Sequence, residues 1–152
     1  MSQEWLNPPE RDKFLSFLDA RFGIPPERFA DYRLFVRGEY LFAIAEAAAK
    51  ASEDYDCPEL GLQLAKLTHS GHHKPTSRGM QVFGDAVTKN VRDLTATDIK
   101  ALVEGRKLEA PGAQGFVILT HAGLPIGVGL CREGRLESQF PRSMTEHLVV
   151  FA

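Results

Sequence analysis

The sequence predicts an α+β protein in which a small α/β module precedes a mixed β pseudobarrel. Two observations predict this class. A capped helix and a hairpin pattern occupy the first half, and short strands joined by glycine turns, with one capped helix, occupy the second. A chain of about 150 residues buries roughly 70% of its extended surface, so this chain of 152 can form a core. A composition of 43% hydrophobic and 25% charged residues excludes collagen-like, coiled-coil and disordered classes.

The first predicted helix has a signal at each end. Asn7 is placed as the N-cap, Pro8 opens the helix, Glu10 stands at the third position, and Gly23 follows the last helical residue. One stripe of the helix is apolar and is expected to face a core, namely Phe14, Leu15, Leu18 and Phe22. The prolines of residues 24–29 then predict a second short helix or a turn.

A hairpin is predicted after this helix. Residues 32–36 and 40–44 are rich in aromatic and branched side chains, and Arg37-Gly38-Glu39 separates them. The alanines of residues 45–50 allow a helix to extend back through the second arm, so residues 40–51 fit either a strand or a helix.

The next stretch predicts a boundary between two domains. Residues 60–64 alternate like a strand, and a long segment from Thr68 to Thr76 then lacks periodicity. We therefore expect one module over residues 1–75 and a second domain over residues 76–152.

The second domain is predicted to consist of short strands and one helix. Residues 86–94 predict a strand that leads into a helix from Thr95 to Glu104, in which Thr95 and Asp98 have capping-box spacing. Further strands follow, joined by glycine turns, at residues 115–120, 126–132, 135–141 and 148–151. The result is a small closed or nearly closed barrel.

Glycines and aromatic residues in this half have two interpretations each. Gly127 and Gly129 lie on one face of their strand, where they allow either a close approach by a ligand or relief of crowding at a bend. Phe116 and Phe140 flank glycines and are expected to pack in the core, with stacking on a base as the alternative. The phenylalanines of the first half are also expected in the core.

Charge and cysteine usage limit the class of protein. The net charge of −2 lacks the basic balance of a free-standing nucleic-acid binder, yet residues 1–68 carry net −4 and residues 69–152 carry net +2 with all five histidines. Cys57 and Cys131 suit a reduced, structural role. We expect a cytoplasmic protein, because the chain has neither a signal-peptide pattern nor an apolar run that could span a membrane.

The motifs of the second half resemble a PUA domain. They are the strand at 87–91, the capped helix, Gly115-Phe116-Val117-Ile118-Leu119, Ile126-Gly127-Val128-Gly129-Leu130 and the tail from Gly134 to Arg142. This order is most similar to the C-terminal PUA of Sun/Fmu-type rRNA cytosine-5 methyltransferases. Residues 21–29 with 32–35 resemble the "pre-PUA" module that precedes a PUA in such proteins and in ribosome-biogenesis factors.

The resemblance implies a non-enzymatic RNA-binding role in rRNA or tRNA modification or ribosome biogenesis. It places the RNA in a cleft edged by eight residues: Thr88, Lys89, Asn90, Arg132, Arg135, Ser138, Gln139 and Arg142. Glu137 departs from the pattern, because relatives usually have Lys before the Ser-Gln pair. This change removes positive charge from the expected site.

The histidine-rich loop leaves three interpretations open. His69, His72 and His73, with His121, suggest a zinc site, although no acidic or Cys ligand stands at a recognised spacing. The loop is otherwise a solvated segment, or its histidines contact phosphate together with Lys74 and Arg78. We expect no metal and no cofactor.

No catalytic motif is recognised in the chain. It lacks a dinucleotide fingerprint, a P-loop, a nucleophile elbow and the Pro-Cys arrangement of the methyltransferases, since Cys57 precedes Pro58. The expected partner is structured RNA, with neither DNA nor a membrane. The alternative is an accessory subunit that docks onto an RNA methyltransferase or assembly factor and has little RNA affinity of its own.

Overall fold

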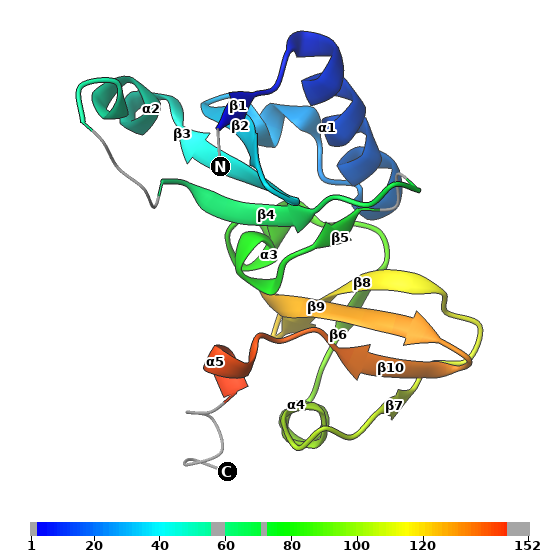
Figure 1. Ribbon diagram of the computed structural model, residues 1–152. Helices are drawn as coiled ribbons and strands as arrows, with labels where there is room; N and C mark the ends of the chain where they lie inside the picture. Colours follow the sequence, from blue (N-terminus) through cyan, green and yellow to red (C-terminus); the bar gives the residue numbers. More distant parts are fainter. Residues whose placement is uncertain (1–2, 56–59, 71–72, 146–152) are drawn as a thin grey trace.

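The computed structural model describes residues 3–55, 60–70 and 73–145. Two five-stranded sheets lie one above the other, with helix α3 (Ser77–Phe83) between them (Figure 1). The first sheet has the order β1-β2-β3-β4-β5 and is antiparallel: β1 (Glu4–Trp5), β2 (Tyr32–Arg37), β3 (Tyr40–Ala45), β4 (Leu62–Lys66) and β5 (Lys74–Pro75). The second has the order β6-β8-β9-β10-β7: β6 (Val91–Asp93), β7 (Leu108–Glu109), β8 (Gly115–His121), β9 (Leu124–Arg132) and β10 (Arg135–Ser138).

Helix α1 (Pro8–Phe22) confirms the predicted capping signals. The Asn7 side chain accepts from the Glu10 N–H, the Glu10 carboxylate accepts from the Asn7 N–H, and Gly23 ends the helix at φ 69°. The four residues of the predicted stripe are all buried, and a short 3-10 helix, η1 (Pro26–Phe29), follows. Local sequence therefore determines this helix and its ends.

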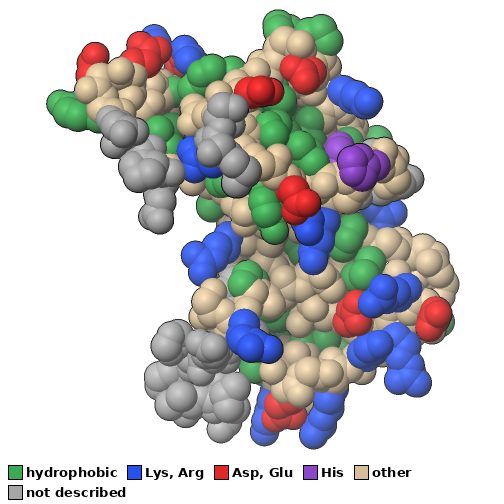
Figure 2. Space-filling model, in the orientation of Figure 1, with side chains coloured by type: hydrophobic (Ala, Val, Ile, Leu, Met, Phe, Trp, Pro, Cys, Tyr) green, Lys and Arg blue, Asp and Glu red, His purple; other side chains and the backbone are tan. Residues whose placement is uncertain are grey.

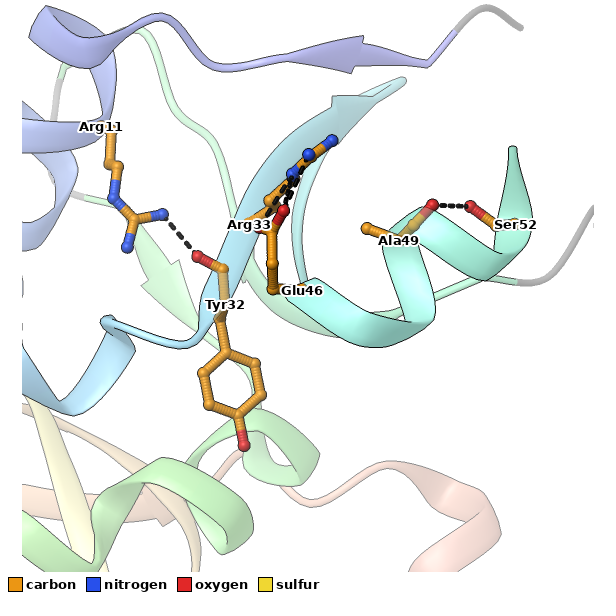
Figure 3. Close-up of polar contacts among 6 residues, drawn as sticks. All are labelled: Arg11, Tyr32, Arg33, Glu46, Ala49 and Ser52. Carbon is orange, nitrogen blue, oxygen red and sulfur yellow. Dashed lines mark hydrogen bonds and ion pairs between the residues drawn. The ribbon is translucent and has the colours of Figure 1, made fainter. Parts of the chain in front are cut away.

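The ambiguous stretch divides into a strand and a helix. β2 and β3 form the predicted hairpin, and α2 (Glu46–Ser52) begins directly after β3. Figure 3 shows how Arg33 of β2 holds the start of α2 through an ion pair of 2.8 Å with Glu46, while the Ser52 hydroxyl donates to the Ala49 carbonyl at 2.7 Å. The hydrogen bond from Arg33 lowers the pKa of Glu46.

The predicted long unstructured segment is wrong in its second part. Lys74 and Pro75 pair with β4 as strand β5, and the Thr76 hydroxyl caps α3 by accepting from the Gly79 N–H at 3.0 Å. Buried Met80 and Phe83 on α3 explain the helix, since they pack into the main core.

The predicted strand over residues 86–94 is also corrected. Its first residue, Ala86, ends a 3-10 turn, η2 (Gly84–Ala86), and only Val91–Asp93 is a strand. The N–H groups of Thr88 and Lys89 donate to the Phe22 carbonyl at the end of α1, so they do not pair with a strand, and Asn90 leaves the extended conformation at φ 51°. Helix α4 (Ala96–Val103) has the predicted capping box of Thr95 and Asp98.

Two tight turns join β8, β9 and β10. Ala122 and Gly123 have φ of 50° and 79°, and Glu133 and Gly134 have 54° and 74°, which is the geometry of type I′ hairpins. The strand predicted to reach Pro141 ends at Ser138 and is followed by α5 (Arg142–Thr145). The strand predicted at 148–151 lies outside the described residues.

The second sheet curls into an open pseudobarrel, as the sequence predicts. Its edge strands β6 and β7 approach each other, and the Arg92 guanidinium on β6 donates to the Glu109 carbonyl on β7 at 2.7 Å. A hollow of about 380 Å³ lies at this seam, lined in part by Asn90, Arg92 and the buried Cys131. Burial raises the pKa of the Cys131 thiol, which suits the predicted structural role.

One hydrophobic core joins the two sheets. The largest cluster combines α1, β2, β3, β4 and α3 with Ile118 of β8 and Val128 of β9. A second cluster fills the barrel around Leu119 and Leu136, and a third lies under α2. The division into modules 1–75 and 76–152 stays a prediction, and the two predicted modules share buried side chains.

The paired glycines of β9 relieve crowding within the chain. A Cβ at Gly127 would collide with the Phe140 ring, and one at Gly129 would lie 2.9 Å from a Leu136 methyl group. Phe140 and Phe116 pack against the cores, as expected. The close approach at these glycines is therefore that of the protein's own side chains. Among the described residues, no helix has the length and apolar character needed to cross a membrane.

Candidate nucleic-acid interface

A cleft of about 510 Å³ lies between the first sheet and the end of β10. Figure 2 shows Lys and Arg side chains bordering the waist of the molecule between β4–β5 and β9. Three of the twelve lining residues are basic and none is acidic. The lining consists of Tyr40, Gln63, Lys66, Lys74, Pro75, Thr76, Ser77, Arg78, Ser138, Gln139, Phe140 and Pro141.

The register of the first sheet builds one wall of this cleft. Tyr40 of β3 is paired with Lys66 of β4, and Lys66 is paired with Lys74 of β5. Directly paired residues share a face of the sheet, and neighbouring strands lie about 4.8 Å apart, so these three side chains form a row about 10 Å long. Two lysines stand opposite each other in the row, which destabilises a sheet, and the Glu39 carboxylate, 3.5 Å from the Lys66 ammonium, offsets part of this repulsion.

The basic side chains of the cleft form few ion pairs and hydrogen bonds with the described residues. Lys66 forms a 3.5 Å ion pair with Glu39, whose side chain is 72% exposed. The Arg78 guanidinium donates to the Ser143 hydroxyl at 3.0 Å, which links α3 to α5. Within the described residues, the Lys74 ammonium has neither a hydrogen bond nor an ion pair. Positive charge is therefore available to an anionic ligand here.

The opposite wall is held rigidly by a buried serine. The Ser77 hydroxyl, at 2% exposure, donates to the Gln139 carbonyl at 3.2 Å and accepts from the Val128 N–H at 3.1 Å. These two bonds fix the chain around Ser138 and Gln139 against β9. Arg142 follows directly after Pro141, on the first turn of α5, and is exposed.

The structure brings together four of the ten residues that sequence reasoning selects. Lys74 and Arg78 line the cleft together with Ser138 and Gln139. Arg142 does not line it, but it is the residue directly after Pro141, which does. The remaining five fall into two other places.

Thr88, Lys89 and Asn90 form the joint between α1 and the second sheet. Besides the two backbone bonds to Phe22, the Asn90 amide donates to the Arg21 carbonyl at 2.6 Å, and a Cβ at Gly23 would collide with the Thr88 hydroxyl. All three residues are exposed, and Asn90 also lines the seam hollow. These contacts hold the segment at the end of α1, outside the lining of the cleft, and its role in RNA binding stays a prediction.

Arg132 and Arg135 lie at the β9–β10 turn, in a region of mixed charge. Arg132 forms a 2.7 Å ion pair with Glu137, and Lys107 approaches the same carboxylate at 3.7 Å. Arg135 is exposed and has no ion pair with a described residue. Figure 2 shows acidic and basic side chains side by side over this end of the barrel. Glu137, the departure noted in the sequence, thus neutralises two nearby cations.

The described histidines, His69, His73 and His121, are not among the residues that line the cleft. The His73 ring contacts Phe14 and Phe17, with centroids 5.9 and 5.6 Å away, and its Nδ1 accepts from the Thr68 N–H at 3.3 Å. His121 lies at the end of β8 in the second sheet, where its ring Nδ1 is 2.7 Å from the carbonyl oxygen of Leu94. The described residues contain no group of three or more His, Cys, Asp or Glu placed to hold a metal, while His72 and Cys57 lie outside them.

Sequence reasoning did not select eight of the twelve lining residues, and Tyr40, Gln63 and Lys66 are the most important of them. Gln63 lay in a predicted strand, Tyr40 in a stretch that fitted a strand or a helix, and Lys66 in no predicted element. None was given a role, because their position in the site depends on the pairing of β3, β4 and β5. A signal for the neighbouring helix α3 was present. Thr76 precedes Met80 and Phe83, which is N-cap followed by helical apolar spacing.

Comparison with known proteins finds a family model that is similar to part of the second half of the chain. Residues 89–145 match the family model described as the methyltransferase RsmF PUA domain. The chain is also 24% identical, over 117 residues, to the Ribosomal RNA small subunit methyltransferase F of Psychromonas ingrahamii. That match covers 73% of this chain and 24% of the relative, so the chain spans about a quarter of the curated protein it matches.

The fold and the comparisons agree on the class of domain. The second sheet and α4 lie within a PUA domain that resembles the C-terminal one of Sun/Fmu-type rRNA methyltransferases. The family match begins at residue 89, and the pre-PUA assignment of the first module stays a prediction.

Proposed function

We propose that this chain is an RNA-binding module that acts in rRNA or tRNA modification or ribosome biogenesis. The carrying observation is the cleft, whose lining has three basic residues, no acidic one, and contributions from both sheets. Phosphate groups are bound by Lys, Arg and short polar side chains on a rigid platform. The relative's name, which describes an rRNA methyltransferase, favours RNA over other polyanions.

Strand β10 extends the proposed surface beyond the cleft. Ser138 lines the cleft at one end of this strand, and Arg135 is exposed at the other. Three residues of extended chain span about 10 Å, and side chains alternate between the two faces of a strand. Arg135 therefore lies on the face opposite Ser138 and meets a phosphate backbone that leaves the cleft and continues around the turn end of β10. Lys74 and Arg78 then bind phosphate in the cleft, Ser138 and Gln139 bond to ribose or base, and Arg142 and Arg135 contact the flanking backbone.

The proposed role is binding without chemistry. The family match covers a PUA domain, and the chain spans about a quarter of a methyltransferase relative. Any methylation in the same process would be the work of an RNA methyltransferase that this module positions on RNA.

Fluorescence anisotropy tests the proposal. The purified chain is titrated with a structured rRNA fragment and with duplex DNA of equal length, from low to physiological salt. We expect tighter binding to RNA, with log K falling linearly with log salt, and a slope lowered by about 0.7 to 0.9 in Lys74→Ala for its one phosphate contact. Equal binding to both, or none at low salt, would contradict the proposal.

A second candidate function is docking onto an RNA methyltransferase or assembly factor. It is favoured by Trp5, which is 42% exposed on the acidic half and borders a hollow of about 300 Å³ with Arg33, Arg11 and Leu6. Trp and Arg dominate the binding energy of many interfaces. Co-purification with an RNA-modifying enzyme that is lost in Trp5→Ala would favour docking, and its absence would leave RNA binding alone.

A further inference from the structure

The cleft holds an aromatic ring that the fold does not use. Tyr40 is half-buried and lines the cleft, yet it belongs to none of the three core clusters. Its hydroxyl makes no hydrogen bond with the described residues. Buried or half-buried tyrosines usually find a partner for the hydroxyl and pack their ring on neighbours. An unengaged ring in a concave site is therefore a surface for a ligand.

Beside this ring lie the two opposed lysines. Lys66 is the direct cross-strand partner of Tyr40, and Lys74 is the partner of Lys66. The backbones of Tyr40 and Lys66 are one strand spacing apart, about 4.8 Å, so their side chains leave neighbouring positions on the sheet. An anion seated between the lysines would relieve their repulsion, and a planar group attached to that anion would meet the tyrosine.

Hydrogen-bonding groups complete the site. The Gln63 side-chain amide has no partner within the described residues, and the Gln139 amide makes only a 3.3 Å bond to its neighbour's carbonyl. Both line the cleft, and an amide can donate to and accept from the edge of a base. The volume of about 510 Å³ falls within the range of small-ligand sites and is far too small for a duplex.

We propose that this cleft binds a single unpaired nucleotide of the RNA, with its phosphate between Lys66 and Lys74 and its base on Tyr40. The inference rests on the proposed function, because it specifies which form of RNA that site takes. Proteins read RNA mainly at unpaired positions, where a base can leave the stack and lie on an aromatic ring. A paired stem would contact only the rim and β10.

Two RNA hairpins test this proposal by anisotropy. They have the same stem, and one carries a single bulged uridine. We expect the wild-type chain to bind the bulged hairpin about 5- to 100-fold more tightly, the range that stacking on one aromatic ring supplies. Tyr40→Ala should remove this preference and Tyr40→Phe should keep it, while Lys74→Ala should weaken binding to the bulged hairpin more than binding to the plain one.

The outcomes separate the two proposals. Equal binding of both hairpins by the wild-type chain would overturn the nucleotide site and leave RNA binding standing. Binding of neither hairpin would overturn the proposed function together with the site.

A cross-linking experiment needs no variant, so it stands even if Tyr40→Ala fails to fold. With 4-thiouridine at the bulge, irradiation of the wild-type complex should link the RNA to the peptide that contains Tyr40 or to the one that contains residues 74–78. Linkage confined to residues 88–90 or 132–135 would overturn the proposal.

Discussion

The cleft and the β9–β10 end of the barrel both carry basic side chains, and they differ in what those side chains face. In the cleft, Lys74 is without an ion pair among the described residues, and no lining residue is acidic. At the barrel end, Arg132 and Lys107 share the Glu137 carboxylate. A phosphate must break such a pair before it gains the cation. A count of charged residues along the sequence therefore overestimates the positive charge available to RNA at the barrel end and underestimates the positive charge available in the cleft.

Charge reversal in each region gives the largest expected contrast. Lys74→Glu should weaken RNA binding at low salt by about tenfold or more, because it removes one phosphate contact and adds repulsion. Arg132→Glu should weaken it less than about threefold, since the wild-type arginine is already neutralised. Anisotropy with one RNA measures both variants, and an equal or larger effect of Arg132→Glu would invalidate the comparison.

The joint between α1 and the second sheet should respond in stability instead of RNA affinity. Asn90→Ala removes the bond to the Arg21 carbonyl and places alanine at φ 51°, and we expect a cost of about 1 to 3 kcal/mol in the free energy of unfolding. Asn90→Gly is the matched control, because glycine accepts this backbone and loses only the side-chain bond. Denaturant unfolding measures both. Unchanged stability in Asn90→Ala with weakened RNA binding would return this residue to the binding site.

Removal of the shared carboxylate should make the two regions more alike. Glu137→Gln frees Arg132 and Lys107, and RNA binding at low salt should tighten by about 1.5- to 5-fold, the scale of an exposed ion pair. The gain should disappear at high salt. Binding that is unchanged or weaker at low salt would show that the barrel end does not face the RNA.

The smallest effect concerns a carboxylate remote from the cleft lining. The Thr120 hydroxyl, which donates to Asp93 at 2.7 Å, and then the Gly123 N–H hold the pKa of this carboxyl below its usual value. Ionised Asp93 therefore stabilises the fold above the ordinary Asp pKa of about 4, and this contribution is lost as the pH falls through the lower folded value. Asp93→Asn should slightly lower the melting temperature at pH 7 and flatten its fall below pH 4, with no change in RNA affinity. A melting temperature equal to wild type at pH 7 would contradict this.

What the sequence predicts correctly is local. Each correctly predicted signal involves residues within four positions of each other, so it can be recognised in a short stretch of sequence. These signals are the capping boxes at Asn7–Glu10 and Thr95–Asp98 and the turns at Gly123 and Gly134. The resemblance to a PUA domain extends this to the order of elements in the second half.

The cleft depends on contacts between distant residues. Tyr40 meets Lys66 and Lys74 only through the register of three strands, and a β-bulge between Leu41 and Phe42 sets that register. Nothing in the local pattern specifies it. The first part of the strand expected at residues 86–94 is wrong for a similar reason, because the backbone N–H groups of Thr88 and Lys89 donate to the Phe22 carbonyl at the end of α1, while Val91–Asp93 is a strand.

The most direct test of the central claim is a chemical-shift titration of the isotope-labelled chain with the bulged hairpin. If the cleft binds RNA, the amide signals that move most should be those of Lys66, Lys74, Arg78, Ser138 and Gln139, and the signals of Thr88, Lys89 and Asn90 should stay near their free positions. Shifts confined to residues 88–90 and 132–135, with the cleft signals unmoved, would contradict the account.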